Sequence, residues 1–102
     1  MVSHNPSKSE FDKLVSSGKT VVDFWAGWCG PCRSQAPIVE QLESTTDVNL
    51  IKIDVDETAC QELVAEYGIS SIPTLVLFDG GKQISRLVGL TPLAKLKEHF
   101  GV

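Results

Sequence analysis

Two cysteines spaced for a disulfide are the residues of this sequence best suited to chemistry. They frame the segment Cys29-Gly30-Pro31-Cys32. If Cys29 caps a helix and Cys32 lies in its first turn, their alpha carbons are roughly 5–6 Å apart, which suits a disulfide. The spacing therefore predicts a bond that can form and break without distortion of the backbone.

The two sulfurs are expected to differ in reactivity. A helix amino terminus offers unpaired N–H groups and a partial positive charge to its cap, which favours a thiolate at Cys29. Since the thiolate is the nucleophile in thiol–disulfide exchange, Cys29 is predicted to attack a disulfide and Cys32 to resolve the mixed disulfide. Pro31 fixes φ at the helix start without the loss of a hydrogen bond, and Gly30 leaves the approach open. Two electrons then pass to the substrate.

Zinc binding is the main alternative for this pair, because C-x-x-C is also half of many structural zinc sites. Tetrahedral zinc needs two more ligands. The candidates are Cys60, His4 and His99, and none of them is paired at the spacing of a zinc knuckle. We therefore expect neither a bound metal nor another cofactor. A purely structural, buried pair is disfavoured because the cysteines flank Gly-Pro rather than an apolar stripe.

The third cysteine, Cys60, lies near the start of a predicted helix. It is interpreted as a small buried hydrophobe, a common environment for a free cysteine. The alternative is a regulatory thiol that takes part in oxidation or dimer formation.

The composition predicts one globular domain over residues 1–102, expected to be a monomer. Such a chain buries roughly 60–70% of the surface that it exposes when unfolded, so its cysteines are not needed for folding. With 9 Lys and Arg against 13 Asp and Glu, the net charge of −4 disfavours nucleic acid and anionic membranes as partners. No apolar run approaches the roughly 20 residues of a membrane span. Met1 to Pro6 lacks the pattern of a secretory signal, so a cytoplasmic location is expected.

Helices and strands are predicted from the spacing of apolar residues and from cap and turn signals. Ser7 to Glu10 has the form of a capping box, and Thr58 and Thr91 are expected to cap two later helices. Asp79-Gly80-Gly81 predicts a tight turn between antiparallel strands. The predicted helices are 7–17, 33–45, 58–67 and 92–100, and the predicted strands are 20–26, 48–55, 74–78 and 83–88, with a short extra strand at 2–4.

This order of elements predicts an α/β fold. Strands joined through helices run parallel with right-handed crossovers, and the final hairpin adds an antiparallel edge. The result is a central mixed sheet of four to five strands, flanked on both faces by about four helices. The cysteine pair falls between the most apolar strand and the longest helix, where open α/β sheets present functional groups.

The segment from Val22 to Cys32, V-D-F-W-A-G-W-C-G-P-C, resembles the active-site segment of the thioredoxin family. Ile72-Pro73-Thr74 and Val88-Gly89 also fall where that family has its substrate-binding elements, so the resemblance spans nearly the whole chain. It implies the thioredoxin fold and a general protein-disulfide reductase, whose substrates are disulfide-containing proteins. It also implies thioredoxin reductase as the partner that recharges the dithiol.

Asp23 is a carboxylate within an apolar strand, where an unpaired charge is expensive to bury. It is therefore expected either to hold a proton for much of the time or to have a partner. The alternative is that Asp23 points to solvent from a sheet edge. The resemblance implies that Asp23 is a buried acid that exchanges a proton with Cys32, and that Lys52 matches a nearby lysine that modulates it.

Pro73 lies at the start of a strand, where its missing N–H costs no ladder hydrogen bond. The resemblance implies a cis Ile72–Pro73 peptide that faces the cysteines and leaves the Ile72 backbone free to pair with an extended substrate. It also implies an apolar rim of Trp28, Pro31 and Ile72 around the nucleophile. Gly89 would let the substrate backbone approach closely.

Two other functions stay open at this point. One is an oxidant or isomerase of a secretory compartment, which the Gly-Pro dipeptide and the lack of a visible signal disfavour. The other is a redox-independent binding module that uses the same docking surface. The sequence also departs from the family pattern in its short first strand, Val2-Ser3-His4, and at Arg33, which replaces the more usual lysine.

Overall fold

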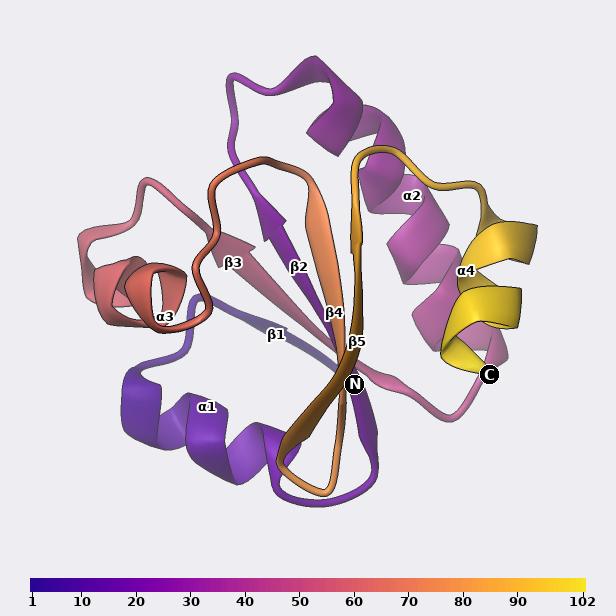
Figure 1. Ribbon diagram of the computed structural model, residues 1–102, viewed down its shortest axis with the longest axis horizontal. Coiled ribbons are helices and arrows are strands. Elements are labelled where there is room, and N and C mark those ends of the chain that lie inside the picture. Colours follow the sequence, from indigo (N-terminus) through magenta and orange to yellow (C-terminus); the bar gives the residue numbers. More distant parts are fainter.

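Five strands form one mixed sheet that carries helices on both faces (Figure 1). The computed structural model describes all residues from 1 to 102. In chain order the elements are β1 (Val2–His4), α1 (Lys8–Val15), β2 (Lys19–Trp25), α2 (Gly30–Thr45), β3 (Asn49–Asp54), the 3-10 helix η1 (Thr58–Cys60), α3 (Gln61–Glu66), β4 (Thr74–Asp79), β5 (Lys82–Val88) and α4 (Leu93–Phe100). The strand order is β1-β3-β2-β4-β5, in which β3 is parallel to β1 and β2, and β4 is antiparallel to β2 and β5. The predicted fold class is confirmed, including the short first strand.

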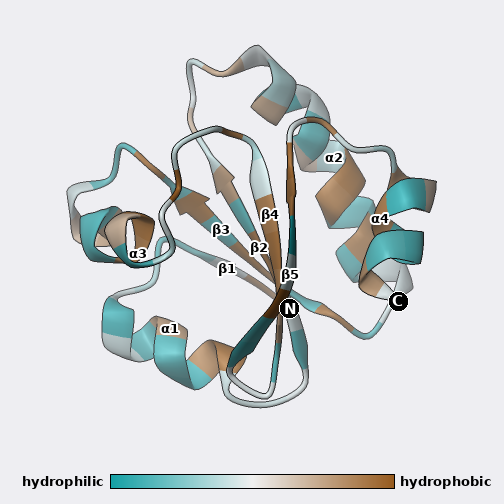
Figure 2. Cartoon of the chain, viewed as in Figure 1, coloured by the Kyte–Doolittle hydropathy of each residue, from teal (hydrophilic) through white to brown (hydrophobic).

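The central strand β2 shows how the two faces of the sheet are separated. Val22 and Phe24 belong to the apolar core under α1 and α3, whereas Val21 belongs to the core under α2 and α4. Because side chains alternate along a strand, Asp23 shares the face of Val21 and lies on the α2 side. Figure 2 shows hydrophobic colour on the central strands, whereas the helices carry both hydrophobic and hydrophilic residues.

The helix that follows β2 begins earlier than its apolar spacing predicted. α2 starts at Gly30 rather than Arg33, because the Cys29 side chain caps it and Pro31 occupies its first turn. The apolar spacing on which the prediction rested begins only at Ala36, so it could not mark this start. The helix continues through Pro37 to Thr45. None of the helices combines the length and apolarity that a bilayer crossing needs.

Two of the three predicted threonine and serine caps are wrong. Ser7 forms the expected capping box with Glu10. Thr58 instead begins η1, which has no side-chain cap, and α3 starts only at Gln61. Thr91 is not the cap of α4 either, because its hydroxyl donates to the Gly89 carbonyl and its backbone is bonded elsewhere. The residue that flanks α4 is Pro92, without a side-chain hydrogen bond.

Candidate active site

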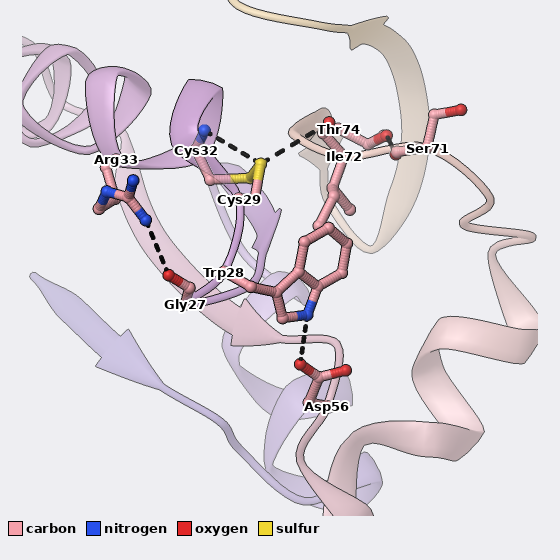
Figure 3. Close-up of a disulfide and its surroundings, with 9 residues drawn as sticks. All are labelled: Gly27, Trp28, Cys29, Cys32, Arg33, Asp56, Ser71, Ile72 and Thr74. Carbon is pink, nitrogen blue, oxygen red and sulfur yellow. Dashed lines mark hydrogen bonds between the residues drawn. A yellow bond between two sulfur atoms is a disulfide. The ribbon is translucent and has the colours of Figure 1, made fainter.

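The cysteine pair lies at the amino terminus of α2, as a disulfide between Cys29 and Cys32 (Figure 3). Their alpha carbons are 5.2 Å apart, within the predicted spacing. β2 ends at Trp25, and a short loop carries the chain from the carboxyl end of this strand to the helix cap. Both cysteines are buried, with 5% of Cys29 and 2% of Cys32 exposed. Cys29 is therefore slightly more accessible than Cys32.

The start of α2 is electrostatically suited to a thiolate at Cys29. The backbone N–H of Cys32 points at the Cys29 sulfur from 3.2 Å, and no acidic side chain lies in the first helical turn. The partial positive charge at a helix amino terminus acts on groups at its cap. When the disulfide is reduced, this N–H and the helix dipole favour the negative charge on Cys29.

The sulfur of Cys29 lies beside the loop that precedes β4. The carbonyl oxygen of Ile72 is 4.0 Å from the Cys29 sulfur (Figure 3), and the Ile72–Pro73 peptide is cis. The loop that follows β5 contacts the same segment, because the Gly89 N–H donates to the Pro73 carbonyl at 2.8 Å. The backbone N–H and C=O of Ile72 form no backbone hydrogen bond. The structure thus brings Ile72, Pro73 and Gly89 together on the side of the Ile72 carbonyl that lies near the Cys29 sulfur.

Trp28 precedes the pair directly and is 69% exposed. Its indole N–H donates to a carboxylate oxygen of Asp56 at 2.8 Å (Figure 3). Asp56 follows the carboxyl end of β3, which lies next to the end of β2 in the parallel pair. No role for Asp56 was predicted from its neighbouring residues, although a place after a neighbouring parallel strand is where functional groups of α/β sheets commonly lie.

Asp23 is inside the protein rather than at an edge, so the exposed alternative is wrong. Its strand is flanked by β3 and β4, only 1% of the residue is exposed, and neither carboxylate oxygen has a hydrogen-bond partner. Burial raises the pKa of Asp23 to about 7, while Lys52 lowers it and Glu40 raises it. The carboxyl group is therefore poised between its two protonation states near neutral pH.

Lys52 lies opposite Asp23 in the register of β2 and β3. Its ammonium group is 3.9 Å from a carboxylate oxygen of Glu40 on α2 and 5.7 Å from the ring centre of Trp25. No hydrogen bond joins Lys52 to Asp23, whose oxygens stay unpaired. Lys52 thus acts on Asp23 through its charge rather than as a bonded partner, and Glu40 partly offsets that charge.

Cys60 lies apart from this site, in the apolar core under α1 and α3. It is fully buried, burial raises the pKa of its thiol, and its S–H is 3.9 Å from the side-chain oxygen of Asn5. These features are those of an unreactive packing residue. No group of three or more His, Cys, Asp or Glu side chains is arranged to hold a metal ion.

Comparison with known proteins gives one consistent match. A family model described as Thioredoxin matches residues 2–101. Thioredoxin of Staphylococcus epidermidis is 42% identical over 92 residues, which is 88% of this chain and 86% of that protein. Thioredoxin of Mycoplasmoides gallisepticum is 42% identical over 97 residues, which is 93% of this chain and 95% of that protein.

Solved structures agree with the sequence matches. A mutant thioredoxin from Halobacterium salinarum superposes with a TM-score of 0.89 at 40% identity, and the match covers 97% of this chain and 87% of that one. Plasmodium falciparum thioredoxin gives a TM-score of 0.85 at 35% identity, with 97% and 96% covered. At these identities the likeness extends beyond the arrangement of strands and helices.

Proposed function

Because this chain belongs to the thioredoxin family, we propose that it is a general protein-disulfide reductase that works through Cys29 and Cys32. The observation that carries the proposal is the disulfide at the amino terminus of α2, beside the unpaired backbone of Ile72. A nucleophilic sulfur and a surface for an extended substrate therefore lie next to each other.

The reaction begins with the reduced dithiol. The thiolate of Cys29 attacks one sulfur of a substrate disulfide, so a bond forms between the two proteins and the other substrate sulfur leaves as a thiolate. The thiolate of Cys32 then attacks the Cys29 sulfur, which forms the Cys29–Cys32 disulfide and releases the second substrate thiolate. The protein is oxidised by two electrons, and the substrate disulfide is reduced to two thiols once its thiolates take up protons.

Asp23 is the residue that we assign to the proton of Cys32. The Cys32 thiol is nearly inaccessible to solvent, so an internal base has to remove its proton before the second attack. A carboxyl group with a pKa of about 7 and no hydrogen-bond partner can accept that proton and release it again at neutral pH. Lys52 modulates the exchange through its charge.

Substrate docking is assigned to the surface around Cys29. Trp28 supplies an exposed aromatic face, and Gly30 and Pro31 place no bulky side chain over the sulfur. The free backbone groups of Ile72 can pair with an extended substrate strand, which Pro73 and Gly89 leave room to approach. Recognition through backbone groups and apolar contacts suits substrates of varied sequence.

We further propose that this single domain acts as a monomer in the cytoplasm and is recharged by a thioredoxin reductase. A reductive cycle needs a compartment that keeps thiols reduced, which is the condition of the cytosol. The net charge of −4 supports protein partners over nucleic acid or anionic membranes.

Insulin reduction with dithiothreitol as the electron source tests the proposal. The wild-type protein should accelerate the reaction, and Cys29→Ser should abolish the acceleration. Cys32→Ser should instead accumulate a mixed disulfide with insulin, visible as a reducible band on a gel. Full turnover by the Cys29→Ser variant would refute the assigned nucleophile. A double variant without either thiol that still bound target proteins at wild-type strength would favour a redox-independent binding module.

A further inference from the structure

Gln35 is a fully buried polar side chain on α2, one turn beyond Cys32. Glutamine is seldom fully buried in proteins. Its side-chain N–H donates to the Thr91 carbonyl at 3.0 Å, and its side-chain oxygen accepts from the Thr91 N–H at 2.8 Å. One amide group thereby satisfies both backbone polar groups of one residue in the loop between β5 and α4.

The hydrogen bonds continue from Thr91 to the docking surface. The Thr91 hydroxyl donates to the Gly89 carbonyl at 3.0 Å, and the Gly89 N–H donates to the Pro73 carbonyl at 2.8 Å. Pro73 follows Ile72, whose carbonyl oxygen lies 4.0 Å from the Cys29 sulfur. Since Cys29 caps the helix that carries Gln35, both the nucleophile and the segment that faces it are tied to α2.

Packing contributes little to the position of the segment from Val88 to Leu90. Val88 and Leu90 are both exposed. Gly89 has a φ of +94°, and a Cβ placed on it would meet no atom within 4 Å. Thr91 does not cap α4, so that helix does not fix the loop through a side-chain bond. Val88 itself is paired with Thr74 at the end of β5. Beyond that strand, the hydrogen bonds from Gln35 are the side-chain hydrogen bonds that join this loop to α2.

We propose that Gln35 is a positioning residue for substrate docking, which holds the Val88–Leu90 segment at a fixed place relative to Cys29 by pairing with both backbone groups of Thr91. This inference rests on the proposed reductase function. A polypeptide substrate that lies along Ile72 and Gly89 depends on that placement. A small aromatic disulfide needs only access to the Cys29 sulfur, so its reduction does not depend on Gln35.

The test compares these two kinds of disulfide in single-turnover reactions of the reduced protein. Gln35→Met keeps the length of the side chain and removes both hydrogen bonds. The matched control is Gln41→Met, the same change at an exposed position of α2. For insulin, Gln35→Met should raise the half-saturating concentration roughly 10- to 100-fold and retain the limiting rate. Reduction of dithiobis(nitrobenzoate), a small aromatic disulfide, should stay at the wild-type rate. Gln41→Met should change neither reaction.

Gln35→Glu supplies a conservative variant. A protonated carboxyl group can accept from the Thr91 N–H and donate to its carbonyl, as the amide does, whereas an ionised one cannot donate. Burial favours the protonated form, so insulin binding relative to wild type should weaken as the pH rises from neutral to alkaline. Insulin binding that strengthened relative to wild type as the pH rose would contradict the role of the two hydrogen bonds.

Backbone amide exchange gives a readout that needs no substrate. In Gln35→Met the Gly89 amide should exchange faster, while that of Val22 in the central strand should keep its wild-type protection. Equal losses on both disulfides, or an unchanged insulin half-saturation in folded Gln35→Met, would overturn the inference. A wild-type protein that reduced neither disulfide would instead overturn the reductase function on which the inference rests.

Discussion

Replacement of Asp23 by asparagine measures what the buried carboxyl group costs in stability. Burial raises the pKa of Asp23 from its ordinary 3.8 to about 7 in the folded protein. Between these two values the folded protein keeps a proton that the unfolded chain has lost, so the free energy of unfolding falls as the pH rises. Each tenfold change in proton affinity is worth about 1.4 kcal/mol. The wild-type protein should therefore lose about 4 kcal/mol across this interval and no more from Asp23 above it.

Denaturant unfolding of the oxidised protein over a pH series measures this effect. Asparagine resembles a protonated aspartate in shape and carries no charge, so the contribution of Asp23 is absent from Asp23→Asn. The stability difference, variant minus wild type, should grow by about 4 kcal/mol from about pH 4 to about pH 8, because contributions from other titrating groups cancel. Asp47→Asn, at an exposed position, is the control for the loss of one negative charge.

A stability difference that stayed constant over this pH range would refute the reasoning, since Asp23 would then ionise alike in the folded and unfolded states. A difference that grew in the opposite direction would also refute it, because it would mean that the folded protein favours the carboxylate. A general loss of packing in the variant would change the free energy of unfolding by the same amount at every pH, so it would not hide the expected growth of the difference.

The charges near Asp23 and the buried thiol supply two further predictions. Lys52→Met removes the cation that lowers the pKa of Asp23, so the pH midpoint of mixed-disulfide resolution, followed by stopped flow, should move to higher pH. Glu40→Gln should move that midpoint to lower pH, and shifts in one direction from both variants would contradict the assignment. Cys60→Ala empties a small volume in the core under α1 and α3, which should lower the free energy of unfolding by about 1 kcal/mol and leave insulin reduction unchanged. Loss of reduction by a folded Cys60→Ala protein would give this thiol a part in the reaction.

The sequence predicted the features that depend on neighbouring residues. The order of helices and strands, the capping box at Ser7 and the spacing of Cys29 and Cys32 all follow from patterns a few residues long. The turn between β4 and β5 belongs to the same class, because Gly80 and Gly81 both take positive φ angles of +60° and +86°. This turn type needs residues that tolerate such angles.

Among the features that the sequence did not predict are polar pairs between distant elements. Trp28 and Asp56 are 28 positions apart, and Gln35 and Thr91 are 56 apart. A threonine before a proline has the local form of a helix cap, so Thr91 was assigned to α4, whereas its backbone is bonded to another helix. A signal did exist for Gln35, because it precedes Val39 by four positions and therefore lies on the buried face of α2.

Gln35 and Asp23 are two buried polar residues on the α2 side of the sheet, and their hydrogen bonding differs. The difference distinguishes a structural role from a chemical one. Gln35 has both of its polar atoms paired, as is usual for a buried amide. Asp23 has neither oxygen paired, and it is the only ionisable group among the buried side chains without partners. An asparagine at position 23 should raise the free energy of unfolding, so stability does not account for a carboxyl group there. The exchange of a proton does account for it. It follows that Asp23→Asn should stabilise the protein and slow its disulfide exchange, and a variant that was both more stable and equally fast would remove the reason for a carboxyl group at this position.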